Sequence, residues 1–458
     1  MLSSEIDLKR AEEILKEILT NKEEFENYHS SEIAKILKEI YLKAGKEEFF
    51  SYIKKIPQEH LGEILLNLPE YIKDEALSEL SVKKLVDAVD KLESDDAADL
   101  IQDLKEISLE KEKEVLSKLD DEDVKEIEAL NLYKDDQAGS LMQTELFSAK
   151  LDEKISDAIK RLKELKEKKG LENVHLVFLV DEFGLFVGAM PLEDVITFDF
   201  NKTFRDYLTE HYKHFPYVKA TDPIDDVVKI FEDFDLVVLP VVDEKNRLIG
   251  RITYDDIVDV IEERATEQMY KMAGVDDESE EERDIISITK TRAFWLGVNL
   301  LTAILASFVI GLFDKTIQSY VALAILMPIV ASMGGNAGTQ SLTVMVRQLA
   351  LGEITWSEAK SAISQEVLVS LLNGALFAII MGIIAVVWFG DGKLGVVIAL
   401  AMVINLFFAG LFGALIPLTL KRLGVDPAVA SSVLLTTVTD VVGFFAFLGL
   451  AKVILLGN

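Results

Sequence analysis

Oxygen-bearing side chains recur at helical spacing within an apolar stretch near the end of the chain. Ser432, Thr436 and Asp440 are four residues apart in SSVLLTTVTDVVGFF, so on a helix they share one face, with Thr437 beside them. An ionised carboxylate at bilayer depth costs about 2.5–3.5 kcal/mol and usually marks an ion path. We therefore predict an ion pore in which Asp440 is the metal ligand and the three hydroxyl residues line the wall. The plainer alternative is that the hydroxyls bond backbone carbonyls and Asp440 pairs locally.

A second polar group interrupts the apolar segment PIVASMGGNAGTQ, residues 328–340. Glycines flank Asn336 there, and they allow either close helix packing or an unwound backbone that lines a cavity. The spacing leaves both interpretations open. We predict that Gly335 and Asn336 line the same pore as Asp440.

Five long apolar runs must position these residues. They lie at about 293–313, 320–346, 363–389, 394–420 and 431–456, and each reaches the roughly 20 residues that span a bilayer as a helix. One set of connecting loops holds Lys290, Arg292, Arg347, Lys360, Lys421 and Arg422, and the other holds Lys315, Lys393 and Lys452. The positive-inside rule then predicts a multi-pass plasma-membrane protein with a cytoplasmic N-terminus and an extracellular C-terminus.

Charge separates the chain into two parts. Residues 1–284 contain 39 Lys and Arg against 72 Asp and Glu, a net charge of −33, whereas residues 285–458 carry +2. Such an acidic region excludes nucleic acid as a partner and favours cations. The sequence contains no cysteine, which rules out thiolate metal sites and leaves oxygen ligands.

The acidic part shows two kinds of periodicity. Residues 1–135 have Leu and Ile at three- and four-residue spacing, which predicts an all-α superhelical domain. Residues 136–200 and 201–263 each contain strand, acidic turn, strand and a helix that opens with an acidic pair. The repeated pattern, clearest in LPVVDEKNRLIGRITYDDIVDVI, resembles a tandem pair of cystathionine-β-synthase (CBS) modules with an α/β fold. Residues 264–290 are expected to form a long connecting helix to a five-helix transmembrane domain, residues 291–458.

In this order, the parts and the motifs MGGNAGTQ and LGVDPAVASSVLLTTVTDVV resemble the MgtE family of magnesium channels and transporters. The resemblance implies a homodimer in membrane lipid, with one pore on the two-fold axis and Mg²⁺ bound at Asp440. Several family members have an Asn where this chain has Ser432. Mg²⁺ prefers octahedral oxygen coordination and dehydrates reluctantly, so two carboxylates around a hydrated ion would suit it.

The same resemblance implies negative feedback, in which cytosolic Mg²⁺ bridges acidic surfaces and closes the pore. The candidate regulatory ligands are Asp95, Asp96, Asp99, Asp235, Asp256, Asp259, Glu263 and Glu267. Many relatives have Glu-Asp where this chain has Glu267-Gln268, which predicts a weaker closing site there. ATP is a further expected ligand of the CBS pair, at residues that the sequence does not assign.

The sequence therefore predicts a non-enzymatic Mg²⁺ channel or transporter that mediates magnesium uptake. No GxxxxGK[ST] motif is present, so coupling to ATP hydrolysis is not expected. Two alternatives stay open: transport of Co²⁺, Mn²⁺ or Zn²⁺, and a non-conducting membrane-anchored sensor of Mg²⁺ or nucleotide. An intramembrane carboxylate argues against the sensor, because a simple anchor has no use for one.

Overall fold

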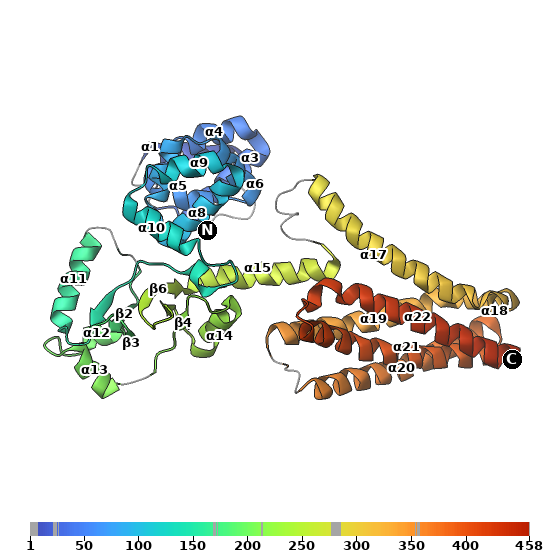
Figure 1. The fold of residues 1–458 in the computed structure, drawn as a ribbon. Helices are drawn as coiled ribbons and strands as arrows, with labels where there is room; N and C mark the ends of the chain where they lie inside the picture. Colours follow the sequence, from blue (N-terminus) through green and yellow to red (C-terminus); the bar gives the residue numbers. More distant parts are fainter. Residues whose placement is uncertain are drawn as a thin grey trace. The chain divides into compact units, whose positions relative to one another are not determined.

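The computed structural model divides the chain into two compact units, residues 1–263 and 264–458, and each is described by itself (Figure 1). The structure describes residues 8–21, 25, 27–167, 171, 173–211, 214–275, 285–352, 354 and 358–457. The predicted fold class is confirmed, since the chain is mostly helical, with two small sheets in the first unit and five long apolar helices in the second.

Short amphipathic helices build the first part of unit 1. They are α1 (Leu8–Thr20), α3 (Ser30–Ala44), α4 (Lys46–Ile53), α5 (Gln58–Leu66), α6 (Glu70–Glu79), α7 (Val82–Val89), α8 (Ser94–Ile107), α9 (Leu109–Leu116) and α10 (Asp121–Leu130). Pro57 and Pro69 stand at the N-caps of α5 and α6, where a missing N–H is harmless. Buried Leu and Ile at three- and four-residue spacing join these helices into one core.

Two sheets of identical topology follow. The first contains β1 (Ser148–Lys150), β2 (Leu176–Val180) and β3 (Phe186–Pro191), and the second contains β4 (Val218–Lys219), β5 (Val238–Val242) and β6 (Leu248–Thr253). In each sheet the first pair is parallel and the second antiparallel. The register shifts at the same place in both, next to Val180 and next to Val242. The duplication predicted from the sequence pattern is therefore present in the backbone.

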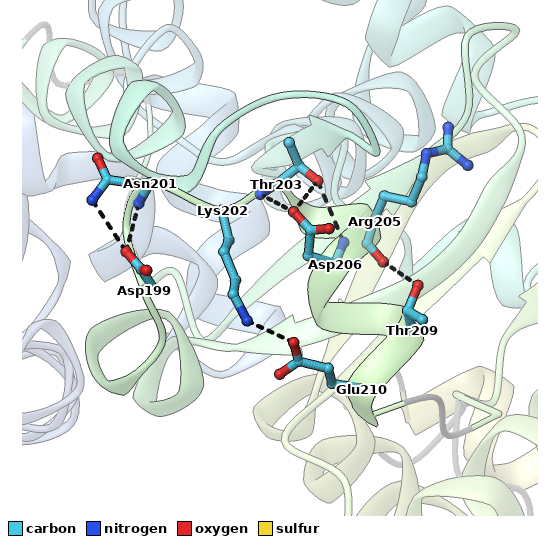
Figure 2. Close-up of polar contacts among 8 residues, drawn as sticks. All are labelled: Asp199, Asn201, Lys202, Thr203, Arg205, Asp206, Thr209 and Glu210. Carbon is cyan, nitrogen blue, oxygen red and sulfur yellow. Dashed lines mark hydrogen bonds and ion pairs between the residues drawn. The ribbon is translucent and has the colours of Figure 1, made fainter.

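Helices accompany both sheets. They are α11 (Ile155–Glu167), α12 (Leu192–Thr197), α13 (Phe204–His211) and α14 (Ile224–Phe234), and α15 (Tyr254–Ala273) begins directly after β6. Figure 2 shows how polar residues start α13: Thr203 N and Oγ1 both donate to Asp206 Oδ2, at 2.9 and 2.8 Å, and Asp206 N donates back to Thr203 Oγ1. This reciprocal pair satisfies N–H groups that have no partner within the helix.

The connecting segment differs from the prediction of one helix reaching the membrane. Helix α15 ends at Ala273, and Gly274 follows with a φ of +70°, a left-handed conformation that terminates helices. Residues 276–284 of the expected helix lie outside the described residues. Helix α17 (Ile285–Gly311) then begins several residues before the expected first span.

The five predicted spans are confirmed as long apolar helices. After α17 and the short α18 (Asp314–Ser319) come α19 (Val321–Ala350), α20 (Ala359–Phe389), α21 (Gly392–Arg422) and α22 (Pro427–Leu456). Helix α21 is the most buried of the five and packs against α19, α20 and α22, while α17 packs on α22 (Figure 1). Large apolar side chains on α17 and α20 stay exposed, as expected for surfaces that meet lipid.

Candidate functional site

The polar stripe on α22 is helical and partly accessible. Thr436 Oγ1 donates to Ser432 O at 3.0 Å, and Thr437 Oγ1 donates to Val433 O at 2.7 Å. These two hydroxyls therefore donate their protons to backbone carbonyls, as the alternative to a pore lining predicted. A hydroxyl that has donated its proton still has lone pairs, so each one can accept a hydrogen bond from water bound to an ion.

Asp440 behaves differently from the hydroxyls. Its side chain is half-buried in the middle of α22. Over the described ranges of the chain, its carboxylate makes no hydrogen bond or ion pair. The alternative in which Asp440 pairs with a nearby residue is therefore not supported among the described residues.

The glycine motif on α19 is not unwound, because the helix runs unbroken through residues 328–340. A methyl group at Gly338 would lie 2.9 Å from Leu435 Cδ1, so this glycine allows α22 to approach. Gly335 has nothing within 4 Å of the corresponding position, and Asn336 is exposed, with Nδ2 3.3 Å from Ser332 Oγ. The packing interpretation is correct, while Gly335 and Asn336 lie on the open side of the helix.

Sequence reasoning missed Asn405 in the middle of α21. This side chain is fully buried, and its Nδ2 donates to Val330 O of α19 at 2.8 Å. The signal was available, because Asn405 is the one strongly polar residue in the apolar run LAMVINLFFAGLFGALIPL.

The carboxylates that the sequence predicts as regulatory ligands partly converge. Asp95 and Asp96 in the first turn of α8 lie close enough to Asp256, in the first turn of α15, for their charges to interact. Burial first, and then the Asp256 charge, raises the pKa of Asp95 to about 9 and the pKa of Asp96 to about 7. Burial also raises the pKa of Asp256 to about 6 against the opposing hydrogen bonds from Thr253.

Asp99 forms the rim of this acidic cluster. Loss of solvent, and then the charge of Asp103, raises its pKa to about 6, although its side chain still reaches the surface. Asp103, which the sequence analysis did not single out, pairs with Lys73 at 2.6 Å. We define the acidic cluster as Asp95, Asp96, Asp99 and Asp256; the positive charge of Lys73 acts on its rim at Asp99.

The remaining regulatory candidates lie outside the cluster, although the charge of Asp259 still acts on Asp256. Asp235 is exposed at the left-handed C-cap of α14, and Asp259 and Glu263 are exposed on α15. Glu267 forms an ion pair with Lys271 one turn later. Among the residues that the structure describes, no group of three or more His, Asp or Glu side chains is arranged to hold a metal ion.

The end of α15 docks within unit 2. Lys271 Nζ lies 3.0 Å from Asp426 Oδ2, while Asp426 Oδ1 accepts from Ala428 N and caps α22. Met272 packs among apolar residues of α19, α21 and α22, including Leu435. The last turn of α15 therefore lies against the helix that carries Asp440.

A cavity of about 470 Å³ lies within unit 1 beside β6. Its lining includes Glu93, Asn173, Arg251 and Tyr254. Arg251 is buried, donates from Nη1 to Asn173 O at 3.0 Å and lies 3.6 Å from Glu93. One guanidinium thus connects α8, the first CBS module and the second.

Comparisons with known proteins agree with this architecture. Models of the MgtE divalent cation transporter, the MgtE intracellular N domain and the CBS domain match residues 327–450, 28–136 and 205–263. The magnesium transporter MgtE of Thermus thermophilus is 31% identical over 433 residues, which cover 92% of this chain and 95% of the relative. The magnesium transporter MgtE of Enterococcus faecalis is 33% identical, with 72% of each chain covered.

A solved structure is also similar. The crystal structure of the cytosolic domain of the Mg²⁺ channel MgtE in complex with ATP is 25% identical, with a TM-score of 0.49, and the match covers 56% of this chain and all of that one. The full-length relatives decide the assignment, because they match the apolar helices of unit 2 as well as unit 1. This chain belongs to the MgtE family of transporters.

Proposed function

We propose that this protein is a homodimeric Mg²⁺ channel that mediates magnesium uptake and is closed by cytosolic Mg²⁺. The observation that carries the proposal is Asp440, a half-buried carboxylate at mid-membrane depth without a hydrogen bond or ion pair over the described ranges. Two such carboxylates across a two-fold axis balance the charge of one divalent ion. Because Mg²⁺ dehydrates reluctantly, the ion keeps its water shell, which Thr436, Thr437 and Asn336 contact.

Growth of a magnesium-requiring, transport-deficient bacterial strain tests the pore. We expect the wild type to restore growth at low Mg²⁺ and Asp440→Ala to fail. The matched control is Asp314→Ala, because Asp314 is exposed on the short α18 and accepts hydrogen bonds from Gln318, one turn later on the same helix. Equal growth of the Asp440→Ala strain and the wild type would refute the pore assignment.

Ion selectivity is tested separately from conduction. Oxygen ligands also accept Mn²⁺, Co²⁺ and Zn²⁺, although a site that contacts only the water shell favours the strongly hydrated Mg²⁺. Reversal potentials in mixed divalent solutions distinguish these ions. A larger permeability to Mn²⁺ or Co²⁺ than to Mg²⁺ would make the protein a transporter of those metals.

The acidic cluster supports the proposed feedback. Its carboxyl groups have raised pKa values because burial and mutual repulsion disfavour their charges, so a bound divalent cation would relieve this cost. A cation that binds only the compact state shifts the equilibrium toward that state. We infer that Mg²⁺ acts in this way between α8 and α15, with Asp235, Asp259, Glu263 and Glu267 as outlying ligands.

Patch recordings with varied cytosolic Mg²⁺ test the feedback. We expect millimolar Mg²⁺ to close the wild type but to leave a quadruple variant open, with carboxylates replaced by amides at Asp95, Asp99, Asp256 and Asp259. A control variant removes four exposed acids of the helical part, namely Glu47, Glu79, Glu110 and Glu128. Full closure of the first variant by Mg²⁺ would refute the mechanism.

We infer that the C-terminal end of α15 transmits the signal to the pore. Lys271 pairs with Asp426, whose other oxygen caps α22, and Met272 packs against the apolar cluster to which Leu435 of the same helix belongs. A movement of α15 therefore pulls directly on the helix that carries Asp440. The N-terminal unit is cytoplasmic in this proposal, as the charge of the loops predicts.

We also infer that ATP binds in the cavity beside Arg251. The guanidinium of Arg251 is the positive group of this cavity, which Glu93, Asp255 and Asp259 also line, and the exposed ring of Tyr254 offers a surface for the base. Equilibrium dialysis with labelled ATP tests the site. Tyr254→Ala is expected to weaken binding, whereas Phe183→Ala, which removes an exposed ring on the other module, is expected to leave it unchanged.

A further inference from the structure

Asn405 lies between the two helices that carry the proposed pore residues. It is fully buried near the middle of α21. A methyl group at Gly334 of α19 would lie 2.2 Å from Asn405 Nδ2, and one at Gly443 of α22 would lie 2.8 Å from the same atom. Gly334 is two residues from Asn336, and Gly443 is three residues from Asp440. The amide of Asn405 therefore lies within about one helical turn of both proposed pore residues along the helix axes.

Asn405 makes a directional hydrogen bond at a position where an apolar side chain could fill the space. Asn405 Nδ2 donates to Val330 O, while the buried Asn405 Oδ1 has no hydrogen-bond partner among the described residues. A buried acceptor without a donor costs free energy, and an apolar side chain of similar size would avoid that cost. Apolar surfaces, however, allow neighbouring helices to slide, whereas a directional hydrogen bond specifies one axial position.

We propose that Asn405 is a positioning residue for ion passage, whose amide sets the register of α19 against α21 through the bond to Val330 O, with Gly443 of α22 packed on the same side chain. The proposal rests on the proposed pore function of Asp440 and Asn336. A slip of α19 by one residue moves Asn336 by about 1.5 Å along the axis and turns it by about 100°. Such a change alters which oxygens meet the water shell of the ion, so Asn405 governs discrimination between divalent ions without touching them.

The first test is Asn405→Leu, which keeps the branching of the side chain at Cγ and removes the hydrogen bond. Full-length protein in proteoliposomes is assayed for Mg²⁺ and Ca²⁺ flux, and size-exclusion chromatography confirms folding. We expect discrimination of Mg²⁺ from Ca²⁺ to fall by about tenfold, which is the ratio that one intramembrane hydrogen bond can supply. The matched control is Asn373→Leu, the same substitution at an exposed position on α20, which is expected to leave discrimination unchanged.

A size-swap pair separates packing from positioning. Gly334→Ala places a methyl group against Asn405 and is expected to reduce flux. Adding Asn405→Ala makes room for that methyl group and is expected to restore flux, but not discrimination. A double variant with wild-type discrimination would overturn the positioning role.

A distance measurement tests the same inference without transport. The chain has no cysteine, so Val344→Cys on α19 and Leu434→Cys on α22, both exposed, can be spin-labelled without a background signal. With spin-diluted dimers, Asn405→Leu is expected to shift or broaden the distance distribution by at least about 1.5 Å. An unchanged distribution together with unchanged discrimination would refute the inference about Asn405. Absence of Mg²⁺ flux in the wild type would instead refute the proposed function and the role of Asn405 in ion passage.

Discussion

The substitution Asp95→Asn is expected to stabilise helix α8 at neutral pH. Asp95 is buried at 6% exposure, and its pKa of about 9 in the folded protein compares with 3.8 for an ordinary Asp carboxyl. A raised pKa means that folding favours the protonated acid. Its contribution to stability is therefore complete below about pH 4 and is lost progressively as the pH rises toward 9.

The size of the effect follows from these two pKa values. Between pH 3.8 and pH 7, each pH unit lowers the free energy of unfolding by about 1.4 kcal/mol. At pH 7 the carboxyl of Asp95 therefore lowers it by at most about 4 kcal/mol. Asn cannot ionise and avoids this cost. Part of the raised pKa of Asp95 comes from the charges of Asp96 and Asp256, which are themselves mostly protonated at low pH. The measured gain in stability should therefore lie below that maximum.

Hydrogen exchange of α8 in the full-length protein, without Mg²⁺, measures this gain. We expect the opening free energy of α8 in Asp95→Asn to exceed that of the wild type at pH 7, with the difference shrinking toward pH 5. Glu128→Gln, an exposed change on α10, is the control and is expected to have no such effect. A gain that is absent at pH 7, or equal at pH 5 and pH 7, would refute the reasoning about burial.

Three further outcomes are expected. Added Mg²⁺ should slow exchange of α8 more in the wild type than in Asp95→Asn, because the cation relieves the same charge; equal protection would contradict this. Lys271→Met should raise the Mg²⁺ concentration for half-closure several-fold in patch recordings, since a partly exposed ion pair contributes up to about 1 kcal/mol; an unchanged midpoint would exclude coupling through Asp426. Phe49→Ala, at a fully buried position, should cost about 3–5 kcal/mol and melt the helical part at lower temperature by circular dichroism, while Mg²⁺ flux persists with weaker feedback; flux lost together with the helical part would contradict this separation.

Local properties of the sequence predicted much of the molecule. The five spans follow from apolar runs, and the duplicated sheets follow from a repeated strand and turn pattern, because both depend on residues close in the chain. The helix end at Ala273 was missed. The period of α15 suggested continuation, whereas the left-handed backbone at Gly274 terminates the helix.

Contacts between residues that are far apart in the sequence could not be predicted from local sequence patterns. The motif at 328–340 was compatible with an unwound segment or a packing face; the unbroken helix excluded the first, and the approach of Asn405 and Leu435 to its glycines supported the second. Likewise, eight acidic residues looked alike as regulatory ligands. Tertiary packing buried Asp95 near the charge of Asp256 and left Asp235 exposed at the C-cap of α14.

The sequence by itself determined where the chain crosses the membrane, where its negative charge lies and which carboxylate stands in an apolar span, because hydropathy and charge are properties of each residue. The tertiary structure decided which polar groups have partners: Asn405 bonds α19, Lys271 holds the cap of α22, and Asp440 has no such bond over the described ranges. Burial and pairing depend on what other segments bring to a side chain, and folding alone supplies those neighbours.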